Sequence, residues 1–279
     1  MIDRVKWSEV IQAGAAYWIS RNSPVVIENV DSSFVPASWT LEDIVKRFGD
    51  VKLRILRGRS QYFKFDDKKE REIVQMSLGD FYKKAVIDIG QDGYYYALGR
   101  SPIDQFEGLK ASMELPPSLS RIVDGTLRRP ERNLWISPKG TRTALHFDAV
   151  ENFNLQIEGS KSFLLFPPRI NDMFCYPLNS QAAYVSSFDP RDTEKRSENF
   201  PYDSGIEVVL RAGEMIYLPY GWWHQIDSIG ERNMNANYWW FPRLKLLTYP
   251  NQTLRGMAVL AHRKGSHPHK RAQKMSQST

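Results

Sequence analysis

Two histidines and one aspartate stand out as residues that can bind a metal ion. His146 and Asp148 lie two positions apart in the run Leu-His-Phe-Asp at 145–148, and His224 ends the run Tyr-Gly-Trp-Trp-His at 220–224. Three further histidines lie near the end of the chain: His262, His267 and His269. Residues two apart on a β-strand project to the same face, so His146 and Asp148 can present a nitrogen and a carboxylate oxygen to one point.

Two histidines and one carboxylate on one side of a metal ion form the ligand set of non-heme Fe(II) oxygenases. This set leaves coordination positions open, which a metal needs in order to bind a co-substrate and dioxygen. His-x-Asp pairs also occur by chance. A buried histidine hydrogen-bonded to a strand carboxylate, without a metal, is therefore the alternative for His146 and Asp148.

Alternating amides favour the metal site over that alternative. Two segments alternate amide side chains with apolar ones, and their amides are Asn152, Asn154, Gln156, Asn233, Asn235 and Asn237. On a strand this spacing places all amides of a segment on one face. A sheet packed only on an apolar core does not need such a face, so the pattern predicts an interior that holds a polar ligand.

The elements that must position these residues are short strands rich in aromatic and β-branched residues. The expected strands are 133–137, 142–148, 151–157, 161–166, 206–211, 214–218, 223–228 and 233–241. Eight such strands predict a mainly β protein with flanking helices and a double-stranded β-helix, or jelly-roll, core. The polar segment 167–203 interrupts the pattern, and we expect it to lie over the mouth of the barrel.

The first part of the chain mixes helical and strand patterns. Residues 5–20 have apolar residues at helical spacing, and 24–30 and 51–56 are typical of buried strands. Thr40 and Ser77 are each followed three residues later by Asp, which predicts two capped helix starts. The segment 243–262 predicts a C-terminal helix.

Composition limits the class of protein. The net charge is +6, but eight of the 38 Lys and Arg residues and none of the 32 Asp and Glu residues lie in 241–279. The body therefore carries 30 basic and 32 acidic residues, and the excess charge is in a basic tail at 263–279 that we expect to be disordered. A solubilising tail is favoured over a nucleic-acid contact. Cys175 is the single cysteine, which excludes an internal disulfide and favours an intracellular, cytoplasmic or nuclear, location. No apolar run is long enough to span a membrane.

Several ordered motifs together resemble one family. They are Thr-Ala-Leu-His-Phe-Asp at 143–148, Gln-Ile-Glu-Gly-Ser-Lys at 156–161, Leu-Phe-Pro-Pro at 165–168, and Ala-Gly-Glu-Met-Ile-Tyr-Leu-Pro at 212–219 leading to His224. This set resembles JmjC-domain hydroxylases of the cupin superfamily, and in style the asparaginyl hydroxylase that acts on hypoxia-inducible factor. The likeness covers about 20–242 and is specific in 133–241.

The resemblance implies roles for individual residues. Fe(II) is implied at His146, Asp148 and His224. Lys161 is implied to pair with the distal carboxylate of 2-oxoglutarate, and Thr143 to hydrogen-bond the same group. The sequence alone favours Lys161 as an exposed hairpin lysine just after Gly159, and the resemblance reverses that interpretation.

Further co-substrate contacts are implied at Asn152 and Asn237, near the iron-bound end. Trp239 either walls the pocket or serves as a core aromatic. Tyr96, with Tyr94 on the same face as the alternative, is implied to supply another hydroxyl to 2-oxoglutarate.

The implied reaction is oxidative decarboxylation of 2-oxoglutarate to succinate, with O2 as oxidant, coupled to hydroxylation of a C–H bond. A protein or peptide side chain is the favoured substrate. The alternatives are a small metabolite, an RNA base, lysine demethylation by the same chemistry, or a non-catalytic metal-binding cupin. His-x-Asp and the lack of cysteines for accessory zinc sites favour hydroxylation over demethylation.

The expected organisation is one oxygenase domain at 1–242, with an N-terminal α/β part at 1–132 and the jelly-roll core at 133–242. The helical segment 243–262 and the tail 263–279 follow. In relatives of this family C-terminal helices support dimers, so a homodimer through 243–262 is expected, with self-packing of that helix as the alternative.

Overall fold

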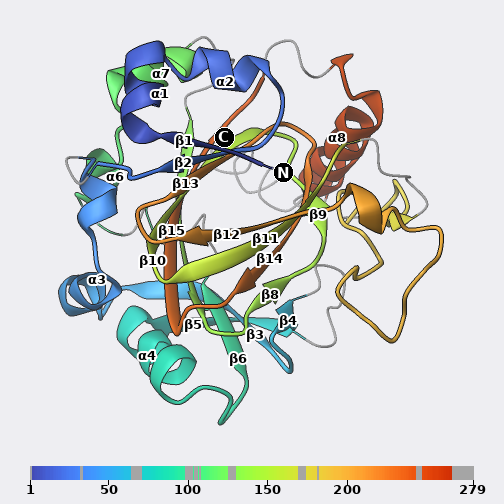
Figure 1. Ribbon diagram of the computed structural model, residues 1–279. Helices are drawn as coiled ribbons and strands as arrows, with labels where there is room; N and C mark the ends of the chain where they lie inside the picture. Colours follow the sequence, from blue (N-terminus) through green and yellow to red (C-terminus); the bar gives the residue numbers. More distant parts are fainter. Residues whose placement is uncertain are drawn as a thin grey trace, which may run out of the picture.

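The computed structural model describes residues 2–31, 34–63, 71–97, 103, 106, 108–124, 130–168, 174–180, 182–242 and 247–265. Two β-sheets lie at its centre, and helices surround them (Figure 1). No helix among the described residues is long and apolar enough to cross a membrane.

The larger sheet has nine strands in the order β1-β2-β13-β10-β15-β7-β6-β3-β5. Their bounds are β1 Asp3–Lys6, β2 Val25–Glu28, β13 Met215–Leu218, β10 Glu151–Glu158, β15 Arg232–Trp240, β7 Glu131–Pro138, β6 Tyr94–Ala97, β3 Lys52–Gly58 and β5 Arg71–Ser77. N-terminal strands thus extend both edges of the sheet whose centre comes from the second half of the chain.

The smaller sheet has the strand order β12-β11-β14-β8-β4, and β9 also pairs with β14. Its strands are β12 Ile206–Arg211, β11 Ser160–Phe166, β14 Trp223–Ser228, β8 Arg142–Thr143, β4 Tyr62–Phe63 and β9 His146–Phe147. Consecutive strands of the second half of the chain are divided between the two sheets, as in a double-stranded β-helix. The predicted fold class is confirmed, and seven of the eight expected strands end within two residues of the observed bounds.

The eighth strand prediction, 142–148, is wrong because this segment contains a bulge. Arg142 pairs with Asp227 and His146 pairs with His224, so four steps along one strand oppose three steps along the other. One extra residue divides the segment into β8 and β9, and Asp148 lies just after β9. Bulges of this kind often lie beside active sites, where they redirect side chains.

The N-terminal helix prediction for 5–20 is also partly wrong. Residues 3–6 form β1, which pairs in parallel with β2, and the helix is divided into α1 (Trp7–Ala13) and α2 (Ala16–Ser20). Gly14 between them has φ +79°, a conformation that ends a helix. Sheet pairing has overridden the helical spacing of the first residues.

Other helices cover the outer face of the larger sheet (Figure 1). They are η1 Val35–Ser38, α3 Leu41–Phe48, α4 Leu78–Tyr82, η2 Lys83–Ile87, α6 Leu109–Ser112 and α7 Pro117–Asp124. The predicted caps are confirmed, because Thr40 accepts a hydrogen bond from Asp43 N at 3.1 Å and Ser77 accepts one from Asp80 N at 3.0 Å. Apolar residues of these helices form the main core with the outward side chains of the sheet.

The segment 174–203, as far as it is described, lies against the smaller sheet. Ser186 N donates to Leu145 O at 2.8 Å, and Phe147 N donates to Tyr184 O at 3.1 Å, so the segment pairs with β9. The short helix η4 Tyr202–Ser204 begins at its end, and aromatic residues of the segment pack with Trp223 on the face of β14 opposite His224. Its expected place over the barrel mouth stays a prediction.

The C-terminal helix α8 runs from Pro250 to Gly265, three residues beyond its predicted end. It packs closely on the chain just after Asp148, since a Cβ added to Gly256 would lie 2.8 Å from Ala149 Cβ. Residues 243–246 and most of the expected tail, 266–279, lie outside the described residues.

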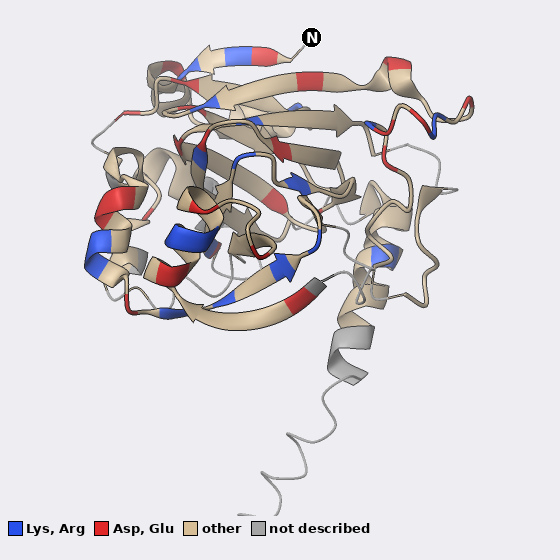
Figure 2. Ribbon diagram, turned by 90° about the horizontal axis from the view of Figure 1, so that it is seen from below, with Lys and Arg blue, Asp and Glu red and all other residues tan. Residues whose placement is uncertain are grey.

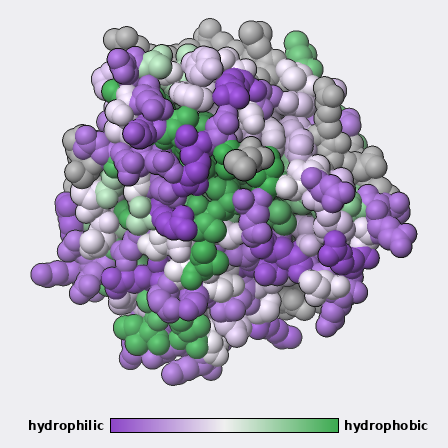
Figure 3. All heavy atoms as spheres, in the orientation of Figure 1, coloured by the Kyte–Doolittle hydropathy of each residue, from purple (hydrophilic) through white to green (hydrophobic). Residues whose placement is uncertain are grey.

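The surface is mostly polar. Lys and Arg are interspersed with Asp and Glu in the view of Figure 2, and hydrophobic residues on the face of Figure 3 gather in a band at the centre and in a patch at the lower left.

Candidate active site

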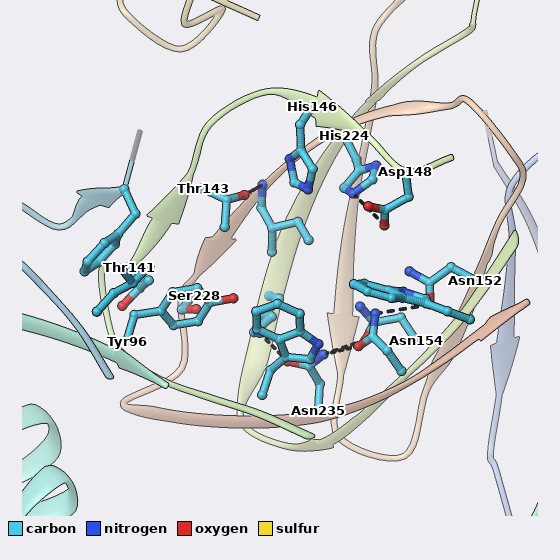
Figure 4. A pocket seen from close by; sticks show the side chains of 17 residues that line it. Tyr96, Thr141, Thr143, His146, Asp148, Asn152, Asn154, His224, Ser228 and Asn235 are labelled. Carbon is cyan, nitrogen blue, oxygen red and sulfur yellow. Dashed lines mark hydrogen bonds and ion pairs between the residues drawn. The ribbon is translucent and has the colours of Figure 1, made fainter. Parts of the chain in front are cut away.

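His146, Asp148 and His224 come together inside the barrel, as the sequence predicts. Their candidate ligand atoms all lie within 4.8 Å of one another. His224 Nε2 is 3.7 Å from Asp148 Oδ2, and the two imidazole rings are 4.2 Å apart. Figure 4 shows the three side chains grouped at one end of a cavity. Such a cluster, with the cavity on its open side, has the arrangement of a metal site with free coordination positions.

Both histidines are held in one tautomer. His146 Nδ1 lies 2.8 Å from Ala144 O, and His224 Nδ1 lies 3.0 Å from Trp222 O. A carbonyl oxygen only accepts hydrogen bonds, so each Nδ1 carries the proton and the lone pair of each ring is on Nε2. Burial, and after it the neighbouring His224, lower the pKa of His146 to about 3. The His146 ring is therefore neutral, which metal binding requires.

The bulge between β8 and β9 explains this geometry. The residues that it removes from regular pairing are used locally: Ala144 O holds the His146 ring, and Thr143 Oγ1 accepts a hydrogen bond from Ile226 N at 3.1 Å. The Thr143 hydroxyl thus satisfies a backbone N–H of β14 that would otherwise lack a partner. Its own proton stays available for a ligand.

A cavity extends from the three ligands between the two sheets. Its lining residues are Leu56, Phe63, Tyr96, Trp135, Thr141, Thr143, His146, Asp148, Asn152, Asn154, Lys161, His224, Ile226, Ser228, Asn235, Asn237 and Trp239. All nine residues that the sequence assigns to iron and 2-oxoglutarate are among them. The cavity is polar along one wall and aromatic along another, as expected for a small polar ligand.

Lys161 lies in this cavity and not on an exposed hairpin. The residue is 3% exposed, and its ammonium donates a hydrogen bond to Asn235 Oδ1. Burial lowers the pKa of its ammonium to about 7. Among the described residues no carboxylate pairs with it, so a bound anion would supply the missing opposite charge.

Lys161 follows the tight turn between β10 and β11. Gly159 makes this turn with φ +78°, and a Cβ there would lie 2.1 Å from Arg232 O. A side chain at 159 would therefore displace the strand that carries Lys161.

Tyr96 is the tyrosine that lines the cavity, and Tyr94 packs beside it against other side chains. The Tyr96 ring lies 5.7 Å from that of Trp135, nearly parallel to it. Burial, and then the charge of Asp148, raise the pKa of Tyr96, so its hydroxyl keeps its proton and can donate. Trp239 lies 6.2 Å from Trp135, between centroids, and both walls the pocket and packs on an aromatic neighbour.

The amide face predicted from alternation is only partly a cavity wall. Asn152, Asn154, Asn235 and Asn237 line the cavity. Asn233 instead accepts a hydrogen bond from Ser160 N at 3.0 Å, and Gln156 donates to Glu158 O at 2.7 Å. These two residues lie beyond the end of the cavity and support the β10–β11 turn.

Several lining residues were not predicted. Thr141 and Ser228 add hydroxyls, and Leu56, Phe63, Trp135 and Ile226 add apolar surface. The alternation of side chains along a strand could have indicated two of them. Thr141 lies on the same face as the predicted site residue Thr143, and Ser228 lies on the same face as His224. Strand β4, which carries Phe63, gives no comparable signal.

The fold and site together define a cupin-type barrel with a two-histidine, one-carboxylate cluster. Residues 13–245 match the Cupin-like domain family, and the chain belongs to that family.

Three curated relatives extend the comparison. tRNA wybutosine-synthesizing protein 5 of Mus musculus is 24% identical over 232 residues, which are 79% of this chain and 71% of the mouse protein. Lysine-specific demethylase 8 of Danio rerio is 24% identical over 229 residues, 80% of this chain and 54% of that protein. JmjC domain-containing protein D of Dictyostelium discoideum is 36% identical over 104 residues, 36% of this chain and 23% of that protein. The chain thus spans about half the length of the Danio rerio protein and about a quarter of the length of the Dictyostelium discoideum protein. The predicted JmjC-type likeness is confirmed, and the finer likeness to the asparaginyl hydroxylase stays a prediction.

Proposed function

We propose that this chain is an Fe(II)- and 2-oxoglutarate-dependent oxygenase that hydroxylates a C–H bond of a protein or peptide side chain. The observation that carries the proposal is one buried cavity with three metal ligands at one end and an uncompensated lysine in its wall. A ligand with a metal-chelating end and a distal carboxylate complements both features. 2-Oxoglutarate has this constitution.

The donor set fits Fe(II). Two imidazole nitrogens and one carboxylate suit iron, and in both histidines the other ring nitrogen makes the hydrogen bond that holds a ligating ring in place. Asp148 is the more accessible ligand, with its side chain 21% exposed. The three ligands occupy one side only, which leaves room for a chelating co-substrate.

The residues along the cavity fit 2-oxoglutarate. Lys161, with Thr143 and Tyr96 as hydroxyl donors, would hold the distal carboxylate. Asn152 and Asn237 would contact the metal-bound end, and Trp239 would confine the chain between them. Buried groups of this kind orient a ligand with little cost in reorganisation.

Iron bound here would supply the activation of O2, coupled to conversion of 2-oxoglutarate to succinate and carbon dioxide. The protein's own contribution is to fix the ligands, neutralise the distal carboxylate and exclude water from the cavity. No further acid or base is needed among the lining residues.

A second substrate class is an RNA base, specifically in tRNA. It is favoured by the mouse tRNA wybutosine-synthesizing relative, 71% of whose length the chain covers. Lysine demethylation, suggested by the name of the Danio rerio relative, would use the same cavity. We also propose 1–242 as one oxygenase domain with an intracellular location.

The experiment offers the chain peptide pools, metabolites and total tRNA in separate reactions with Fe(II), ascorbate and 2-oxoglutarate. Mass spectrometry then searches for products heavier by one oxygen atom, with Asp148→Ala as control. Oxidised peptides in the wild-type reaction alone support the proposal. Oxidised tRNA alone replaces the peptide by the RNA base, and loss of methyl groups from lysine replaces hydroxylation by demethylation.

A further inference from the structure

We propose that Lys161, Asn235, Asn237 and Asn152 form a one-way hydrogen-bond relay that turns the Asn152 amide N–H toward the metal end of the cavity. Asn235 is then a positioning residue of the site. This inference rests on the proposed function and adds to it a residue that holds another in its working orientation.

The direction of the relay begins at Lys161. An ammonium group only donates hydrogen bonds, so the Asn235 atom that it contacts must be the amide oxygen. Asn235 is 2% exposed, and water therefore does not offer its amide an equivalent partner. Lys161 thereby removes the freedom that an amide otherwise has to exchange its oxygen and nitrogen positions.

Further hydrogen bonds across the strand pair β10–β15 continue the relay in the same direction. Asn235 Nδ2 has two protons and uses both, toward Asn237 Oδ1 at 2.8 Å and Asn154 Oδ1 at 3.0 Å. Because the oxygen of Asn237 is turned toward Asn235, its nitrogen points onward and donates to Asn152 Oδ1 at 3.1 Å. Each amide in the line therefore accepts from the Lys161 side and donates away from it.

The line ends at Asn152. Its oxygen is occupied by Asn237, and Nδ2 has no partner among the described residues. Figure 4 shows Asn152 on the Asp148 side of the cavity. An N–H donor here would meet an anionic oxygen of a ligand that chelates the metal, whereas the amide oxygen would repel it. In a buried site this difference is not screened by water.

Oxalate with Mn(II) tests the relay at the metal end alone. Oxalate chelates a metal through two carboxylate oxygens but lacks the carbon chain that would extend it toward Lys161. Asn235→Asp keeps the size and an acceptor for Lys161 but cannot donate to Asn237. The relay then reverses and presents the Asn152 oxygen to oxalate. We expect oxalate affinity to fall about tenfold to a hundredfold, the range of one hydrogen bond to a charged group.

Asn154→Asp is the matched control. It adds the same charge to the same wall, but it still accepts from Asn235 and leaves the relay in its direction. If oxalate were weakened only by repulsion from the added carboxylate, Asn154→Asp should lose more oxalate affinity than Asn235→Asp. The reason is that Lys161 would neutralise the carboxylate that Asn235→Asp introduces. The relay predicts the larger loss for Asn235→Asp. Lys161→Met gives a second route, since it removes the orienting donor at a distance from oxalate and should weaken oxalate binding as well.

Mn(II) binding, followed by electron paramagnetic resonance, separates the two levels of the proposal. If the wild type does not bind Mn(II), the proposed function fails and the relay with it. If the wild type binds Mn(II) and oxalate, but Asn235→Asp and Lys161→Met bind oxalate as tightly as the wild type, only the relay is wrong. A larger loss in Asn154→Asp than in Asn235→Asp also contradicts it.

Discussion

His146 and His224 are direct partners across two antiparallel strands, β9 and β14. Each ring is held by the carbonyl two residues earlier in the chain, and the two ring centroids lie 4.2 Å apart. The pair is thus built by backbone pairing and fixed by backbone carbonyls. This arrangement presents two equivalent nitrogen ligands to one point before any metal binds.

The protonation of Lys161 should control the affinity for 2-oxoglutarate. Without a ligand its pKa is lowered to about 7 by burial, and binding of a dianion requires the protonated form. As pH rises above 7 the protonated fraction falls, so the apparent Kd should increase up to about tenfold per pH unit. Calorimetry with Mn(II) in place of Fe(II) measures this. Lys161→Met should weaken binding by about a hundredfold or more and remove the pH dependence, while Mn(II) binding persists; a pH slope that survives in this variant would contradict the assignment.

The same group predicts how stability changes with pH in the absence of ligand. Because the folded pKa of Lys161 lies below the unfolded value, between about pH 7 and 10.5 the unfolded chain binds one more proton than the folded one. This group's contribution to the free energy of unfolding therefore rises with pH in that window. Below pH 7 both states are protonated and the buried charge destabilises most. Urea unfolding at several pH values should show Lys161→Met more stable than wild type at pH 6, with the difference decreasing toward pH 10; a constant difference would be evidence against a charged, buried Lys161.

Arg255 of α8 should hold the segment that pairs with β9. Its Nη1 donates to Tyr176 O at 2.8 Å and to Ala183 O at 3.0 Å. Arg255→Ala leaves both carbonyls without this donor and should lower the free energy of unfolding by about 2–3 kcal/mol. It should also speed proteolysis within 174–186. Asn251→Ala, at an exposed position of the same helix, is the control, and equal effects of the two substitutions would disprove the role of Arg255.

We propose a homodimer through α8. Leu254, Met257 and Leu260 are 53%, 62% and 49% exposed on this helix in the single chain. Light scattering should give twice the chain mass for wild type and one chain mass for Leu254→Glu combined with Met257→Glu. The double variant should unfold at the same temperature in dilute solution, because these side chains do not support the monomer core. A monomeric wild type would exclude the dimer.

Much of the site was predictable from local spacing. Alternation on a strand places His146 with Asp148 and the asparagines with one another, and the scarcity of histidines in the body singles out His224. Local spacing does not place Lys161 in the site, because a lysine two residues after a glycine turn is predicted to be exposed. Only the resemblance of the surrounding motifs placed it inside the cavity.

The remaining features depend on long-range pairing, which local patterns do not encode. The β8–β9 bulge exists because Arg142 and His146 pair with residues some 80 positions later. The helical spacing of 5–20 does not reveal that its first residues pair with β2. Likewise, alternation places Asn233 and Asn235 on the same face of the strand and does not distinguish them. Only the position where the cavity ends makes Asn235 a lining residue and leaves Asn233 to support the β10–β11 turn.

The most direct test of the oxygenase assignment is succinate formation from 2-oxoglutarate with Fe(II), ascorbate and O2, even without a primary substrate. The wild type should form succinate above the rate of the metal-free reaction. Asp148→Ala and His146→Ala should each reduce it to that background. Succinate formation that is absent in the wild type, or unchanged in both variants, would contradict an oxygenase built on His146, Asp148 and His224.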